Sequence, residues 1–234
     1  MANTPRYAIY FSPASDSAVT RFGAAMLGYD AFSGEVMSFP VDVADAFADW
    51  AEVTSDPRKY GFHGTLKAPF SLADGQNEAE LLAACGTFAA TARPIPVIKP
   101  VIRAIGDFIA VVPDQRSATL DSLAQHCVVT FDRFRAPLSA ADRARRNPAA
   151  LTPRQVEHLD RWGYPYVAEE FRFHMTLTGR LAADRHPAIV AMLRERFDVL
   201  DVGSLPIDRL ALFRQDDPAS RFRIIAHHPL RSAD

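Results

Sequence analysis

Two short segments of the chain repeat one another, and they carry the residues best suited to chemistry. Residues 61–66 read Gly-Phe-His-Gly-Thr-Leu, and residues 172–177 read Arg-Phe-His-Met-Thr-Leu. Their histidines, His63 and His174, lie 111 residues apart in a chain of 234 residues, which is close to half its length. The repeat predicts two lobes, each of which supplies one histidine and one threonine to a shared site.

A pair of histidines is suited to the cleavage of a phosphate ester. With an unperturbed pKa of ~6.5, one imidazole can be neutral and remove a proton while the other is protonated and donates one to the departing oxygen. The hydroxyl groups of Thr65 and Thr176 can hold the non-bridging oxygens of the phosphate. This chemistry requires no metal and no cofactor, so we expect neither.

Both segments are predicted to be β-strands, in which side chains two positions apart share a face. The polar faces would then hold His63, Thr65 and Lys67 in the first segment, and Arg172, His174 and Thr176 in the second. The Phe and Leu side chains point the other way, into a core. On this alternation, Lys67 or Arg172 could offset the charge of a bound phosphate.

A structural interpretation of the histidines has to be weighed against the catalytic one. A lone histidine on a strand is most often a structural or surface residue, and one His-x-Thr tripeptide is weak evidence. The repeat favours the catalytic interpretation for His63 and His174. A metal site is less favoured, because neither histidine is followed by a carboxylate two or four residues later. Five histidines that do not repeat are interpreted as structural or surface residues: His126, His158, His186, His227 and His228.

The elements around the two motifs follow one order twice. Short apolar runs predict strands at 7–11, 60–67, 95–104, 108–112, 171–179, 207–213 and 222–226. Helical spacing predicts helices at 15–27, 77–91, 119–134 and 186–197, and residues 30–58 are expected to be loop with one short helix near 44–50. We therefore expect an α+β fold in one domain, with two pseudo-symmetric βα-type lobes (about 1–105 and 106–234) whose antiparallel sheets face a central cleft.

One segment, residues 135–167, has no counterpart in the first half. It combines six arginines with Trp162, Tyr164 and Tyr166, and Thr152-Pro153 inside it is typical of a helix start. The segment either covers the cleft and helps to set substrate size, or it is a surface segment whose aromatic residues pack against the core. Under the first interpretation, Arg143 is a candidate for substrate binding.

Composition narrows the class of partner. A net charge of −2 and a pI of about 6.4 argue against a protein that coats long nucleic acid. Both cysteines, Cys85 and Cys127, lie in apolar stretches that are typical of buried, reduced thiols. No stretch is apolar over the ~20 residues that span a bilayer, and the N-terminus lacks the pattern of a signal peptide. We expect a cytoplasmic protein that does not bind membranes.

The paired motifs, His63-Gly64-Thr65 and His174-Met175-Thr176, resemble the signature of the 2H phosphoesterase superfamily, in which each lobe holds one such motif. That superfamily includes 2′-5′ RNA ligase-like proteins and cyclic nucleotide phosphodiesterases. Residues 161–167 (Arg-Trp-Gly-Tyr-Pro-Tyr-Val) and the second motif after them are similar to a bacterial branch found with phosphonate-metabolism genes, the DUF1045 type. The resemblance covers essentially the whole chain.

The resemblance implies a phosphoesterase that opens a cyclic phosphodiester on a small ribose or nucleotide, such as a phosphoribosyl 1,2-cyclic phosphate. Two alternatives stay open: an enzyme that processes RNA ends, and a non-catalytic nucleotide-binding module. Tyr7 and Phe213, on neighbouring predicted strands, are candidates to stack on a base or sugar. The candidates to bind an additional phosphate are Arg6, Lys67, Arg172, Arg214 and Arg223.

Overall fold

A mixed helical and antiparallel architecture positions the two motifs. Within residues 5–233, which the computed structural model describes, seven strands form one sheet in the order β4-β5-β6-β2-β1-β8-β9. These strands are β1 (Arg6–Phe11), β2 (Gly64–Ser71), β4 (Pro100–Ile105), β5 (Phe108–Pro113), β6 (Met175–Thr176), β8 (Arg209–Gln215) and β9 (Arg223–Pro229). A separate small sheet pairs β3 (Val97–Ile98) with β7 (Leu205–Pro206).

The two motif strands, β2 and β6, lie side by side in the middle of the large sheet and pair through Gly64 and Met175. Outward from β2 come β1 and β8, and outward from β6 come β5 and β4, so the strand order runs symmetrically from the centre. The expected α+β class is confirmed, but the strands of both halves join in one continuous sheet rather than in two. In addition, β4 from the first half pairs with β5, while β8 and β9 from the second half extend the sheet beyond β1.

Two segments differ from the sequence-based expectation. Of the strand expected at 171–179, only Met175–Thr176 forms β6. Beyond β6 the backbone leaves the regular ladder, because the N–H groups of Leu177 and Thr178 both donate to the carbonyl of Ile109. The N–H of Ile109 in turn donates to the hydroxyl of Thr178 at 2.9 Å. Residues 30–58, where a loop with one short helix near 44–50 was expected, hold three short helices, α2 (Val41–Ala46), α3 (Trp50–Val53) and α4 (Ser55–Arg58).

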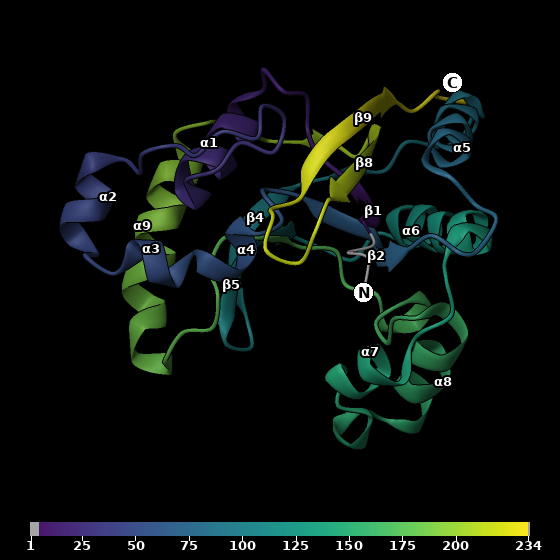
Figure 1. Cartoon of the computed structure of the whole chain (residues 1–234). Helices are drawn as coiled ribbons and strands as arrows, with labels where there is room; N and C mark the ends of the chain where they lie inside the picture. The colour runs from purple at the N-terminus through teal and green to yellow at the C-terminus, as the bar shows by residue number, and fades with distance from the viewer. Residues whose placement is uncertain (1–4, 234) are drawn as a thin grey trace.

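Four helices pack with the sheet into one apolar core. They are α1 (Ala18–Leu27), α5 (Glu78–Ala90), α6 (Ala118–Phe131) and α9 (His186–Asp198). In the view of Figure 1, α1 and α9 lie to the left of the sheet and α5 and α6 to its right. Along β1, Ile9 and Phe11 belong to this core, whereas Ala8 and Tyr10 belong to a smaller cluster with Phe213. The face of β1 that carries Tyr10 is the one that carries the site.

Residues 135–167 form a helical insertion that projects below the sheet in Figure 1. Its helices are α7 (Ala140–Arg145) and α8 (Pro153–Trp162), joined through the 3-10 turn η2 (Pro148–Ala150). Thr152 caps α8 as predicted, in a reciprocal pair of hydrogen bonds with Gln155. The insertion begins beside the end of β2, where Arg135 bridges to Leu72. This attachment places the insertion next to the first motif strand.

Three further 3-10 turns complete the secondary structure of the described chain: η1 (Asp132–Phe134), η3 (Ala168–Glu170) and η4 (Ala183–Arg185). None of the helices formed by the described residues is both long enough and apolar enough to cross a membrane.

Candidate active site

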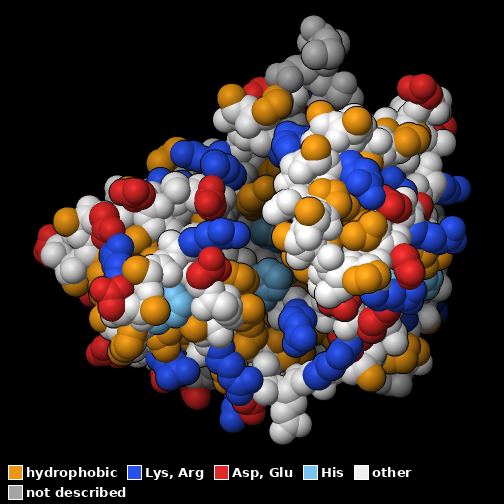
Figure 2. Space-filling model, turned by 90° about the horizontal axis from the view of Figure 1, so that it is seen from below, with side chains coloured by type: hydrophobic (Ala, Val, Ile, Leu, Met, Phe, Trp, Pro, Cys, Tyr) orange, Lys and Arg blue, Asp and Glu red, His pale blue; other side chains and the backbone are white. Residues whose placement is uncertain are grey.

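The two motifs meet at one cavity of about 480 Å³ on the face of the sheet that carries Tyr10, and its walls include His63, Thr65, His174 and Thr176. Figure 2 shows this hollow between two masses of the molecule, with histidine atoms at its floor and Lys or Arg atoms around it. The strand pairing explains the convergence. Because Gly64 lies opposite Met175 in an antiparallel pair, their neighbours all point to the other face, with His63 next to Thr176 and Thr65 next to His174.

Both imidazoles are held in the same way. The Nδ1–H of His63 donates to the carbonyl of Gly61 at 2.9 Å, and that of His174 donates to the carbonyl of Arg172 at 2.7 Å. In each case the acceptor is two residues earlier, and Nε2 is left free to exchange a proton. Thr65 Oγ1 lies 3.4 Å from Nε2 of His63. The repeat in sequence is therefore also a repeat in local geometry.

Burial controls the protonation of the pair. It lowers the pKa of His63 to about 4; the Gly61 carbonyl opposes the shift and a positive charge at His174 adds to it. The pKa of His174 is also lowered by burial, against the opposing effect of the Arg172 carbonyl. Both imidazoles are accordingly neutral at neutral pH in the free protein. A bound phosphate anion favours the charged form, so it would raise these pKa values and let one imidazole act as an acid.

Aromatic rings fix the position of each histidine. Tyr10 stacks on His63, with ring centroids 3.8 Å apart and an interplanar angle of 22°. Phe213 packs behind this pair, 4.9 Å from the ring of Tyr10 and 5.9 Å from that of His63. On the other side, Phe108 lies 5.5 Å from the ring of His174. Phe213 is fully buried, so it supports His63 and does not reach a ligand, contrary to its expected role.

The prediction that Lys67 shares a face with Thr65 is wrong. Tyr10 pairs with Thr65 while the preceding Ile9 pairs with Lys67, so Leu66 is an extra residue in a β-bulge. The bulge reverses the alternation of side chains after Thr65. Lys67 therefore points to the helical side, where its Nζ lies 3.1 Å from both the Val128 carbonyl and Asp132 Oδ1. Its exposed fraction is only 3%.

Three more predicted contacts lie away from the cavity. Tyr7 is in the main core, its hydroxyl donates to Glu78, and burial together with Glu78 raises its pKa to about 12. Arg172 is exposed, precedes β6 and lines a different hollow. Arg143 pairs with Asp160 on the surface of the insertion.

The five cations considered for an additional phosphate separate into two groups. Arg6 lines the cavity, as expected. Lys67 and Arg172 do not, and Arg214 and Arg223 are outside its walls with Asp216 as a shared partner.

Sequence reasoning missed Tyr10, Tyr60 and Phe108 in the wall, and it considered Tyr164 and Arg146 only as parts of the candidate cover over the cleft. Arg146 and Tyr164 come from the insertion, so part of residues 135–167 does form one side of the cleft. The aromatic and basic composition of the insertion was the available signal, although it pointed to Arg143. Among residues 5–233, no group of three or more His, Cys, Asp or Glu side chains is arranged to hold a metal ion.

Two bacterial relatives are similar over most of the chain. The chain is 37% identical over 221 residues to the ribose 1,5-bisphosphate phosphokinase PhnN of Janthinobacterium sp. (strain Marseille), covering 93% of this chain and 49% of that protein. It is 32% identical over 222 residues to the protein of the same name in Laribacter hongkongensis (strain HLHK9), covering 94% and 50%. The chain thus spans about half the length of the curated relatives that it matches.

Two solved structures align with nearly all of the chain at low identity. E. coli LigT complexed with NADP+ aligns with a TM-score of 0.44 and 12% identity, over 98% of this chain and 99% of that one. A phosphoesterase crystal structure aligns with a TM-score of 0.40 and 11% identity, over 97% and 99%. A family model described as a protein of unknown function (DUF1045) matches residues 65–223. This match spans more than half of the sequence, so the chain belongs to the DUF1045 family, as the residues around the second motif predicted.

Proposed function

We propose that this protein is a metal-independent phosphoesterase that opens a cyclic phosphodiester on a ribose or nucleotide, with His63 and His174 as the general acid and base. The observation that carries the proposal is the arrangement of two histidines and two threonines on one face of the β2–β6 pair, in one cavity. Both histidines have Nδ1 bound to a backbone carbonyl, so each offers Nε2 for proton transfer.

The proposed reaction needs two proton transfers at one phosphorus. One neutral imidazole takes a proton from water as the water oxygen bonds to phosphorus, and the other, protonated, gives its proton to the ring oxygen as the P–O bond breaks. Thr65 and Thr176 hold the non-bridging oxygens, whose negative charge grows in the transition state. Net consumption is one water, and the product is a phosphate monoester.

The name of the two bacterial relatives supports a sugar phosphate as the substrate. They are named for phosphorylating ribose 1,5-bisphosphate, and this chain resembles about half of their length. Opening a 1,2-cyclic phosphate of ribose by breaking the bond to the oxygen at carbon 2 leaves the phosphate on carbon 1. The product, a ribose 1-phosphate, would share its phosphate on carbon 1 with the compound that those relatives are named for, which fits a role in phosphonate metabolism.

A panel of cyclic phosphates tests the proposal. Ribose 1,2-cyclic phosphates, nucleoside 2′,3′-cyclic phosphates and RNA with a 2′,3′-cyclic end would each be incubated with the protein in the presence of EDTA. We expect turnover of the ribose compounds that EDTA does not affect, and a loss of about 10²-fold or more in each of His63→Ala and His174→Ala.

Other outcomes would identify the alternatives. Full activity in either histidine variant, or activity lost to EDTA and restored by zinc, would refute the mechanism. A clear preference for the RNA end would favour RNA-end processing. Binding of nucleotides without any turnover would favour the non-catalytic module.

A further inference from the structure

A second pocket adjoins the catalytic cavity. Its volume is about 250 Å³, and it shares Arg6, Tyr60, Pro69 and Arg146 with the walls of the cavity. The two spaces are therefore continuous, and a ligand held between the histidines can extend into the second pocket. The walls there come from β1 and β2 on one side and from the insertion on the other.

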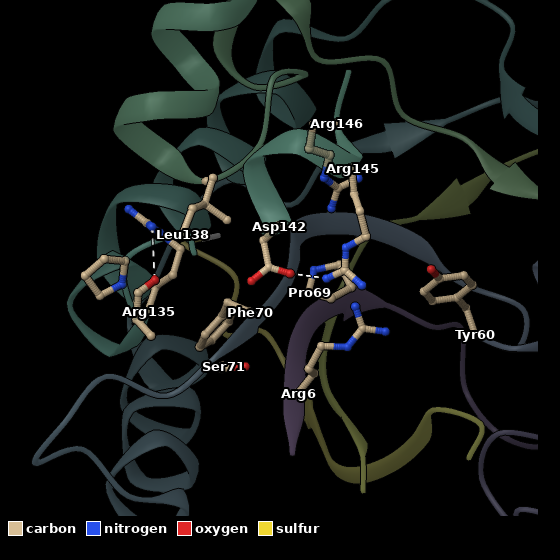
Figure 3. Close-up of a pocket in the computed structure, with 13 residues that line it drawn as sticks. Arg6, Tyr60, Pro69, Phe70, Ser71, Arg135, Leu138, Asp142, Arg145 and Arg146 are labelled. Atoms are coloured by element: carbon tan, nitrogen blue, oxygen red, sulfur yellow. Dashed lines mark hydrogen bonds and ion pairs between the residues drawn. The ribbon is translucent and has the colours of Figure 1, made fainter. Parts of the chain in front are cut away.

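Arginines dominate the charged lining of this pocket. Arg6, Arg135, Arg145 and Arg146 all line it, and Asp142 is the carboxylate among the lining residues. Figure 3 shows Arg6, from β1, and Arg145, from α7, extending toward one another from opposite walls. Two guanidinium groups that face each other repel, and an anion between them would convert that repulsion into attraction. The pocket is thus electrostatically complementary to a negatively charged group.

Two of these arginines are available for such a group. Arg6 bonds to the neutral side chain of Gln215, at 2.9 Å from Nε and 2.6 Å from Nη2, which orients its guanidinium without neutralising it. Arg146 lies over the ring of Tyr164, 5.1 Å from its centroid. Neither Arg6 nor Arg146 is paired with a carboxylate in the described part of the chain. By contrast, Arg135 is paired with Asp132 and Arg145 with Asp142.

We infer that the second pocket binds a phosphate monoester of the same substrate, at the far end of the sugar from the cyclic phosphate. The inference rests on the proposed function, because it places the cyclic phosphate at His63 and His174. A monoester carries close to two negative charges at neutral pH, and the planar fork of arginine matches its oxygens. A diester within an RNA chain carries only one charge and continues into another nucleotide. The arginine pocket therefore selects a small sugar with two phosphate groups.

The test compares ribose 1,2-cyclic phosphate with and without a phosphate on carbon 5. The wild-type protein is expected to have a much higher kcat/KM for the compound that carries the 5-phosphate. The preference is the ratio of the two kcat/KM values. It should fall by about 10- to 100-fold in Arg146→Gln and in Arg6→Gln, which is the usual loss of binding when a hydrogen bond to a charged group is removed.

A matched control is Arg154→Gln. Arg154 is also in the insertion, but it is exposed, pairs with Glu157 and Glu169, and lines neither pocket. The preference of the Arg154→Gln protein for the compound with the 5-phosphate should equal that of the wild type. If the wild type opens both compounds equally well, or if the arginine variants retain its preference, the second-phosphate inference is overturned while the proposed function stands.

Binding of ribose 5-phosphate, measured by calorimetry, separates the two hypotheses. This compound has no cyclic phosphate to hydrolyse, so its binding can be measured without catalysis. If no cyclic phosphate is turned over, the proposed function fails, and the pocket is judged by binding alone. Weaker binding to Arg146→Gln and Arg6→Gln than to the wild type supports the phosphate pocket, and equal binding to all three overturns it.

Discussion

Gly64 of the first motif is packed against Phe173 of the second. A Cβ built at Gly64 would lie 2.4 Å from one carbon of the Phe173 ring and 2.5 Å from another, closer than any side chain can approach. The absent side chain thus allows the ring that precedes His174 to lie against the backbone that follows His63. This contact, together with the pairing of Gly64 and Met175, ties the two histidines to one rigid unit.

Gly64→Ala is expected to destabilise the protein by about 1–3 kcal/mol, the usual cost of overpacking, and to lower catalytic activity because the two motifs move apart. Thermal unfolding and the rate with the best cyclic phosphate would measure the two effects. Gly86→Ala is the control: Gly86 lies within α5 and a Cβ there meets nothing within 4 Å, so stability should rise slightly. A Gly64→Ala protein with wild-type stability and rate would contradict the role of this contact.

Tyr10 is expected to keep the pKa of His63 low by covering its ring. Tyr10→Leu would admit water to the imidazole, and the pKa of His63 should then rise from about 4 toward 6.5. Titration of the imidazole proton signals by NMR measures this shift. Tyr10→Phe retains the stacked ring and should retain the low pKa. An unchanged titration in Tyr10→Leu would show that other neighbours are responsible.

The low pKa of His63 makes stability depend on pH in a definite direction. Between pH 6.5 and about 4 the unfolded chain binds a proton at this residue and the folded chain does not. The stability that the neutral His63 contributes to the folded protein is therefore fully present above about pH 6.5 and is lost as the pH falls toward 4. The free energy of unfolding, measured with urea, should fall less over this range in His63→Gln than in the wild type.

A comparison at pH 8, where the imidazole is neutral in both states, isolates this effect. The difference in stability between His63→Gln and the wild type at pH 8 reports the loss of packing alone. That difference should shrink as the pH falls. A constant difference from pH 8 to pH 4.5 would contradict the predicted linkage.

Lys67 is expected to serve stability and not substrate binding. Lys67→Met removes a cation from Asp132, but the carboxylate keeps its ion pair with Arg135, so the loss should be about 1–3 kcal/mol. The Michaelis constant for the best cyclic phosphate should not change, since Lys67 faces α6 and not the cavity. A raised Michaelis constant in a stable Lys67→Met protein would restore the role that strand alternation predicted.

Tyr164 is expected to limit the size of substrate that enters the cavity. It lines the cavity from the insertion, next to Arg146. Tyr164→Ala should therefore increase activity on RNA with a 2′,3′-cyclic end relative to a small ribose cyclic phosphate. Tyr166→Ala is the control, because Tyr166 is exposed and does not line the cavity. If neither variant changes the ratio of the two activities, the covering role of the insertion fails.

The sequence by itself was sufficient for local features. The repeated motif singled out the two histidines and two threonines that line one cavity, apolar spacing located the four helices of the core, and Thr152-Pro153 located the start of α8. These features depend on interactions within a few residues, or on a repeat that can be seen in one chain. The class of fold follows from them, because each element has one apolar face that must be buried.

Only the tertiary structure decided which side chains meet at the cavity. The bulge at Leu66 turns Lys67 away because one extra residue reverses the alternation, and nothing in the local sequence marks it. Tyr10 becomes a partner of His63 through the register between β1 and β2, and Arg146 reaches the cavity through the path of the insertion. These placements are set by pairings between residues far apart in the chain, which local patterns do not encode.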